Sequence, residues 1–186
     1  MATTASPEDI VRTLFSFLEA QGHTDYMGEA VSQLQHSLQA AALAVEQQAD
    51  EPTVLVALLH DVGRFIPDAA SLPKLTARDG TAFGTRDHET VGANYLRALG
   101  FPPSVYDMVG AHVWAKRYLC ATEPGYWGAL SALSKTTLEL QGGVFTPDHN
   151  KLRVRRWDDQ AKVAGKVVPG LDAYEAMAVR CLAAAR

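Results

Sequence analysis

The segment that most restricts the fold of this chain is PTVLVALLHDVGRF, residues 52–65. From Val54 onward every residue before His60 is apolar, so a helix over this segment has no face suited to water. His60 and Asp61 nevertheless stand side by side within it. Burying a charged group is costly unless the group is paired or coordinates a metal. We therefore expect a helix buried on all sides, whose histidine and aspartate are held by ordinary core hydrogen bonds or by a metal.

The composition is that of an ordinary globular protein and argues against several classes of function. The chain has 186 residues, 47% of them hydrophobic and 20% charged, which predicts a single domain over residues 1–186. A net charge of -4 predicts no basic face for nucleic acid, and the apolar runs are too short to cross a membrane. Two cysteines make no disulfide framework, and MATTASPEDIVRTLF lacks the charged-then-apolar order of a signal peptide. A cytoplasmic location is therefore expected, and the oligomeric state stays open.

Helical periodicity and capping signals recur along the chain. Ser6, followed by Pro7 and two acidic residues, is typical of a helix start. A stretch rich in Pro, Gly, Thr and Asp predicts a long loop over 67–87, and no segment shows the alternation of a strand. The predicted fold class is all-α, a single helical bundle, with further helices over 28–48, 52–65, 88–98, 124–140, 146–164 and 171–184 and one from Pro103 onward.

Four of the six histidines fall on four different expected helices: His36, His60, His88 and His112. A lone histidine on a helix is more often a hydrogen-bonded core residue than a ligand, so none of the four carries an argument alone. A late carboxylate would complete a set, and RRWDDQAK offers two. Asp158 lies within about 60 degrees of the apolar stripe of its helix, by the helical step of about 100 degrees per residue, whereas Asp159 points away. We expect Asp158 to be the inward one, with Asp159 as the alternative.

These residues together have the chemistry of a metal centre. Imidazole and carboxylate groups without thiolates suit iron, manganese or similar divalent ions better than a structural zinc. Asp61 has two oxygens and can bridge two metals. Six ligands are too many for one open site and suitable for two.

At this point the chain resembles the HD-domain superfamily. More narrowly, it is similar to the mixed-valent di-iron oxygenases, which include myo-inositol oxygenase and the phosphonate oxygenases of the PhnZ/TmpB type. The similar stretches span residues 26 to 163: YMGEAVSQLQHSLQAA, ALLHDVGR, HETVGANYL, AHVWAKRYL, LSALSKTTLELQGG and LRVRRWDDQAKV. The resemblance implies an Fe(II)/Fe(III) pair with O2 as co-substrate. One iron would be held by His36, His60, Asp61 and Asp158, and the other by Asp61, His88 and His112, with Asp61 bridging.

The resemblance also implies a substrate site for a small organophosphonate. Its phosphonate group would be bound by Lys116, Ser134, Thr137 and an arginine of RVRR, for which we choose Arg155 because it precedes Asp158 by three residues. A doubly charged phosphonate requires cations and hydroxyl donors, which these residues supply.

Two further positions follow from the same resemblance. Tyr26 would guard the open iron position, and Glu29 would meet a cationic end of the substrate. Arg64 stands where the aminoethylphosphonate enzymes typically carry a histidine, and we count it among the substrate-binding residues. It inclines the prediction toward the trimethylammonium substrate.

The predicted reaction is oxidative cleavage of the carbon–phosphorus bond. The substrate would be a 1-hydroxy-2-(trimethylammonio)ethylphosphonate or its 2-amino analogue, giving glycine betaine or glycine plus phosphate. Two alternatives stay open, an HD-type phosphohydrolase that activates water with the same ligands and a metal-free helical module used for binding. Oxygen consumption during turnover distinguishes the oxygenase from the hydrolase.

Overall fold

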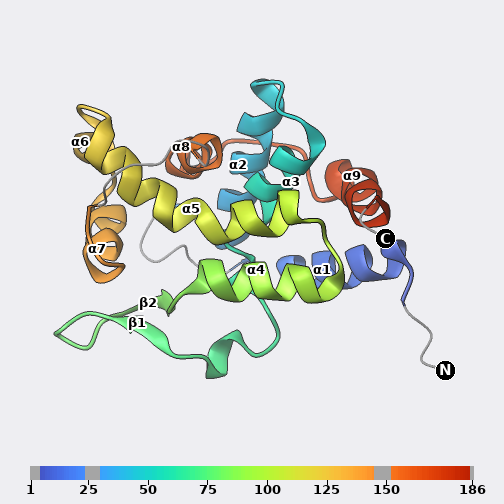
Figure 1. The fold of residues 1–186 in the computed structure, drawn as a ribbon, viewed down its shortest axis with the longest axis horizontal. Coiled ribbons are helices and arrows are strands. Elements are labelled where there is room, and N and C mark those ends of the chain that lie inside the picture. The colour runs from blue at the N-terminus through green and yellow to red at the C-terminus, as the bar shows by residue number, and fades with distance from the viewer. Residues whose placement is uncertain (1–4, 24–29, 145–151, 185–186) are drawn as a thin grey trace.

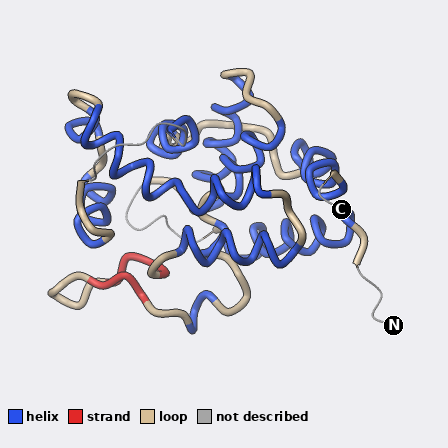
Figure 2. The backbone as a smooth tube through the Cα atoms, viewed as in Figure 1, coloured by secondary structure: helices blue, strands red, loops and turns tan. Residues whose placement is uncertain are grey.

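The structure is a computed structural model, and it describes residues 5–23, 30–144 and 152–184. Helices dominate it (Figures 1 and 2), which confirms the all-α prediction. The α-helices are α1 Pro7–Gln21, α2 Gln33–Glu46, α3 Glu51–Leu59, α4 His88–Leu99, α5 Pro103–Thr122, α6 Tyr126–Ala129, α7 Ala132–Leu140, α8 Leu152–Gln160 and α9 Asp172–Ala183. Two short 3-10 helices, η1 Val62–Arg64 and η2 Ala69–Ser71, follow α3. Within this part of the chain, none of the helices has the length and apolarity needed to cross a membrane.

Helix α3 is the centre of the core, as its apolar sequence predicts. Every residue from Val54 to Leu59 is buried, and α3 packs against α2, α5, α8 and α9. Its start is fixed by Asp50, whose side chain accepts a hydrogen bond from the backbone N–H of Thr53 at 3.0 Å. The helix ends earlier than expected, at Leu59 rather than Phe65, so His60 and Asp61 lie in the turn that follows it.

A close approach of two glycines explains where this turn lies. A Cβ atom on Gly63 would come within 2.1 Å of the carbonyl oxygen of His88, and one on Gly92 within 3.0 Å of the Gly63 nitrogen. Because neither residue has a side chain, α4 can pack directly on η1. This contact brings the turn that carries Asp61 against the first residue of α4, His88.

The expected 67–87 loop contains a small β-hairpin, so the prediction of no strands was wrong there. Strands β1 Lys74–Thr76 and β2 Ala82–Thr85 pair antiparallel (Figure 2). Strands of three and four residues are too short to show alternation in the sequence.

Some helix boundaries also differ from those predicted from the sequence. The 28–48 helix begins at Gln33, where Ser32 forms a capping box with Gln35, and the 124–140 helix is divided into α6 and α7.

Candidate metal centre and substrate pocket

The first group of buried polar side chains consists of His36 on α2, His60 after α3 and Asp158 on α8. The Nε2 atom of His36 lies 2.7 Å from Asp158 Oδ1 and 3.1 Å from Nε2 of His60. Each of the three residues is at most 2% exposed. Three helical segments far apart in sequence therefore present their donor atoms to one small volume.

The second group consists of Asp61, His88 and His112, and it repeats the same arrangement. Nε2 of His88 lies 2.9 Å from Asp61 Oδ1 and 3.1 Å from Nε2 of His112. His88 begins α4 and His112 lies midway along α5. Helices α4 and α5 pack side by side, which fixes the distance between these two histidines.

Asp61 lies between the two groups. Its Oδ1 atom faces His88, whereas its Oδ2 atom lies 3.7 Å from Nε2 of His60 and 4.0 Å from Nε2 of His36. Oδ2 is buried and has no hydrogen-bond partner among the described residues. A buried carboxylate oxygen without a partner is costly, and a cation between Asp61 and the first group would satisfy it.

The ring orientations distinguish this site from a set of ordinary core histidines. The Nδ1 atoms of His36, His60 and His112 lie 2.9, 2.8 and 2.8 Å from backbone carbonyl oxygens, those of Ala161, Ala57 and Val109. A carbonyl only accepts, so each Nδ1 carries a proton and the neutral ring presents the lone pair of Nε2 to the site. This is how protein ligands of metals are oriented.

The consequence is that lone pairs face one another at 3.1 Å in the first group, and a similar contact joins His88 to His112. Such an arrangement is repulsive unless a proton or a metal cation lies between the nitrogens. Both groups thus fit metal ions, with a donor set of imidazole nitrogen and carboxylate oxygen and no thiolate.

The protonation states also suit metal ligands. Burial lowers the pKa of His36, of His88 and, most strongly, of His112, which favours the neutral ring that a metal requires. Burial also acts to lower the pKa of His60, but the adjacent carboxylates of Asp61 and Asp158 outweigh it and raise that pKa. His60 is therefore the ring that most readily takes a proton in place of a metal.

Asp61 stays ionised although it is buried. Burial alone would raise its pKa, but the Arg64 guanidinium and the rings of His60 and His88 hold it well below the usual value. Arg64 Nε lies 3.0 Å from Asp61 Oδ1, and a second guanidinium nitrogen donates to the Phe83 carbonyl in the β-hairpin at 3.4 Å. The hairpin thus helps to hold a buried cation beside the second group.

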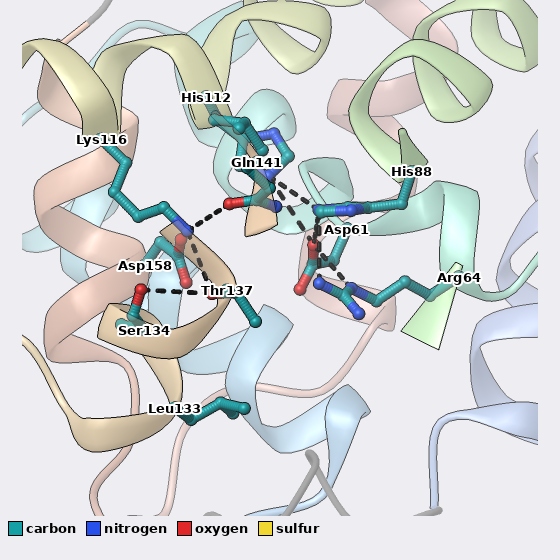
Figure 3. Close-up of a pocket in the computed structure, with 11 residues that line it drawn as sticks. Asp61, Arg64, His88, His112, Lys116, Leu133, Ser134, Thr137, Gln141 and Asp158 are labelled. Carbon is teal, nitrogen blue, oxygen red and sulfur yellow. Dashed lines mark hydrogen bonds and ion pairs between the residues drawn. The ribbon is translucent and has the colours of Figure 1, made fainter. Parts of the chain in front are cut away.

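A pocket opens beside both groups and carries a second buried cation, Lys116 (Figure 3). Lys116, on α5, is 3% exposed, and its Nζ donates to Thr137 Oγ1 at 3.2 Å and to Gln141 Oε1 at 2.6 Å. Ser134 lies one turn before Thr137 on α7 and lines the same pocket. In Figure 3 the side chains of Lys116 and Arg64 reach toward the pocket from opposite sides.

Most of the residues predicted from the sequence therefore meet in one place. The structure brings together His36, His60, Asp61, Arg64, His88, His112, Lys116, Ser134, Thr137 and Asp158. Tyr26 and Glu29 lie outside the described residues, and so does the side chain of Arg155 on α8. Asp158 points into the first group as expected, whereas Asp159 accepts a hydrogen bond from the Tyr126 hydroxyl.

The sequence patterns did not single out two polar residues, Gln141 in the pocket lining and Lys162 beside it. Gln141 is the partner of Lys116, and Lys162 donates from Nζ to Ser134 Oγ at 3.2 Å. Helical spacing could have indicated Gln141, which follows Ser134 by seven residues, two helical turns. It could not have placed Lys162, which lies beyond the end of α8.

The bundle and its paired His/Asp groups define a helical protein built around a buried metal centre. The family model described as "HD domain" matches residues 34–141, and the chain belongs to this family. The match covers α2 to α7, and with them every predicted ligand except Asp158.

Similar proteins give a finer comparison. The chain is 36% identical to a hydroxymethylphosphonate dioxygenase of Gimesia maris, over 98% of this chain and 92% of that relative. It is 38% identical to the [1-hydroxy-2-(trimethylamino)ethyl]phosphonate dioxygenase (glycine-betaine-forming) of Leisingera caerulea, over 73% of this chain and 65% of that relative. An uncharacterized protein, L432, of Acanthamoeba polyphaga mimivirus is 34% identical over 92% of this chain and 81% of the relative. These matches confirm the resemblance to the phosphonate-cleaving HD oxygenases.

Proposed function

We propose that this protein is an O2-dependent di-iron oxygenase that cleaves the carbon–phosphorus bond of a 1-hydroxyphosphonate in the cytoplasm. One observation carries the proposal. Asp61 directs one oxygen to each of two histidine pairs whose Nε2 atoms lie 3.1 Å apart, next to a pocket lined by Lys116 and Arg64. Similarity to two named phosphonate dioxygenases supports the choice of chemistry.

In this proposal the two groups hold an Fe(II)/Fe(III) pair. His36, His60 and Asp158 would bind one iron, His88 and His112 the other, and Asp61 both. Bound there, the pair would supply the activation of O2 and the redox chemistry that no protein side chain provides. The chain itself favours the neutral rings of His36, His88 and His112 and removes the site from bulk water. It orients three of the four rings through Nδ1, those of His36, His60 and His112.

The pocket supplies the groups that recognise a phosphonate. Lys116 gives a fixed charge, Ser134 and Thr137 give hydroxyls, and Arg155 would add a forked donor pair from α8. Substrate entry would replace the bonds from Lys116 to Thr137 and Gln141 with bonds to phosphonate oxygens. Because Lys116 is buried beside the second group, the carbon next to phosphorus would lie close to the metals.

For the substrate we propose 1-hydroxy-2-(trimethylammonio)ethylphosphonate or its 2-amino analogue, with Tyr26 and Glu29 near the open metal position and the cationic end. A second candidate, hydroxymethylphosphonate, is favoured by a different observation. The relative that matches almost the whole chain is named as a dioxygenase of this compound. Hydroxymethylphosphonate also has no cationic end that Arg64 would repel.

The reaction balances with one O2 per turnover. Addition of both oxygen atoms to R–CH(OH)–PO3H2 gives R–COOH and H3PO4, so each phosphate released should consume one O2. An HD phosphohydrolase would instead add water to a phosphate ester and require no O2.

The test is a substrate panel assayed in air and under argon, with the purified iron-reconstituted protein. The panel contains hydroxymethylphosphonate, the 2-amino and 2-trimethylammonio compounds, and 4-nitrophenyl phosphate as the ester control. We expect phosphate from at least one phosphonate, with one O2 consumed per phosphate and no release under argon. Phosphate release at the same rate without O2, or hydrolysis of the ester alone, would overturn the oxygenase and favour the phosphohydrolase.

A further inference from the structure

Gln39 on α2 is a buried amide that takes no part in the two histidine groups or in the pocket. It is 2% exposed, and its side chain binds the backbone of Val163 at two points. Its Nε2 donates to the Val163 carbonyl at 2.8 Å, and its Oε1 accepts from the Val163 N–H at 2.8 Å. Both halves of the amide are thus satisfied by a residue 124 positions away.

The segment that Gln39 binds, residues 161–163, leaves the end of α8 and has no regular structure. Val163 is 51% exposed, so hydrogen bonds rather than burial of this residue must tie the segment to α2. Gln39 provides both bonds with one side chain. It therefore fixes the position of this segment against α2.

The same segment controls two of the proposed metal ligands. The Ala161 carbonyl accepts the hydrogen bond from His36 Nδ1 at 2.9 Å, which sets the ring so that Nε2 faces the site. Asp158 lies only three residues before Ala161, on the last turns of α8. Gln39 follows His36 by one helical turn, so one face of α2 carries both the ligand and the residue that places its acceptor.

The second group is held by different elements. His112 is oriented by the Val109 carbonyl within α5, and His88 is placed by the packing of α4 on η1 at Gly63 and Gly92. A shift of the 161–163 segment would therefore reach His36 and Asp158 before it reached His88 or His112. The effect of losing Gln39 should be unequal at the two groups.

We propose that Gln39 is a positioning residue for the metal site formed by His36, His60 and Asp158, acting through the backbone of Val163 and Ala161. This inference rests on the proposed function, because it assumes that both groups bind metal. It adds that the two sites are positioned independently, and that Gln39 serves only the first. The segment also carries Lys162, which donates to Ser134, so loss of Gln39 should additionally raise KM for the phosphonate.

The test compares Gln39→Leu with the wild-type protein by anaerobic equilibrium binding of Fe(II) and of Co(II). Partners that orient metal ligands typically contribute about 10- to 100-fold in affinity, and we expect a loss of that size at one of two sites. Asp158→Asn weakens the first site. When Gln39→Leu is added to this variant, the affinity of the second site, formed by Asp61, His88 and His112, should change little. Leu182→Ala, in the core on α9, controls for a general loss of stability and should keep both metals.

Three results would overturn the inference. The first is wild-type metal affinity at both sites in Gln39→Leu, and the second is an equal loss of affinity at both sites. The third is a loss of the same size at the second site when Gln39→Leu is added to Asp158→Asn. The first of these, with two metals bound to the wild-type protein, would leave the proposed function intact. A wild-type protein that binds no metal would overturn the proposed function and this inference with it.

Discussion

Replacing Asp61 with asparagine should weaken both metal sites at once, whereas Asp158→Asn should weaken one. Asp61 directs Oδ1 to the His88 side and Oδ2 to the His36 and His60 side. Asparagine has nearly the same shape but only one oxygen and no charge, so it cannot serve two cations. Asp158 belongs to the first group, where its Oδ1 lies 2.7 Å from His36 Nε2. The two variants thus form a matched pair.

The size of the effect follows from the charge removed. A hydrogen bond or contact to a charged group contributes about 1.5–3 kcal/mol, and about 1.4 kcal/mol corresponds to tenfold in affinity. Asp61→Asn should therefore raise the dissociation constant roughly 10- to 150-fold at each of two sites. Asp158→Asn should do so at the first site only.

Folding must be monitored because Asp61 is also the partner of Arg64. Breaking a buried ion pair by removing one partner typically costs about 3–5 kcal/mol. Asparagine reduces this cost, since it keeps a polar oxygen near Arg64 Nε, which lies 3.0 Å from Asp61 Oδ1 in the wild-type protein. For this reason we choose asparagine over alanine.

The assay is the iron content per chain after anaerobic reconstitution and gel filtration, with circular dichroism to verify the fold. We expect two irons in the wild-type protein, about one in Asp158→Asn and fewer than one in Asp61→Asn. A folded Asp61→Asn protein that retains two irons would refute the bridging role. Loss of both irons from Asp158→Asn, with Asp61→Asn unaffected at one site, would show that the two carboxylates had been assigned the wrong way round.

Three further predictions concern the pocket and pH. Lys116→Met and Arg155→Ala should each raise KM for the phosphonate by roughly 10- to 150-fold while both irons are retained. Each substitution removes one charge-assisted contact worth about 1.5–3 kcal/mol. An unchanged KM in both variants would mean that the phosphonate binds elsewhere. Arg64→His should raise kcat/KM for the 2-amino substrate relative to hydroxymethylphosphonate, since it removes a permanent cation beside the site, and a substrate panel that keeps its order would contradict that role. In the metal-free protein the pKa of Asp61 is lowered, so the unfolded chain protonates this carboxylate more readily than the folded chain does. The ionised Asp61 therefore stabilises the fold above about pH 4, and this stabilisation is lost as the pH falls further. Urea unfolding at pH 5 and pH 3 should show the difference between wild type and Asp61→Asn shrinking at the lower pH, and a difference that grows would contradict the lowered pKa.

The sequence alone determined the helical class, the burial of α3 and the identity of most candidate ligands. These features depend on local sequence. An uninterrupted apolar run predicts a buried helix, and the helical step places Asp158 on the apolar face and Asp159 away from it. Because burying His60 and Asp61 is costly, these residues require polar partners or a metal. The chain offers few histidines and carboxylates on other apolar helices, so few candidate ligands had to be considered. The grouping of those residues into two iron sites came instead from resemblance to a family.

Only the tertiary structure decided which donor meets which, because pairing depends on contacts between segments that are distant in sequence. Helix α3 ends at Leu59, and the contact of Gly63 with Gly92 then sets where the following turn meets α4, a packing that no local pattern encodes. The short strands of the hairpin are defined by each other rather than by their own periodicity. Gln39 is the clearest case: in the sequence it is one polar residue among several on α2, and only the position of Val163, 124 residues later, gives its amide two partners.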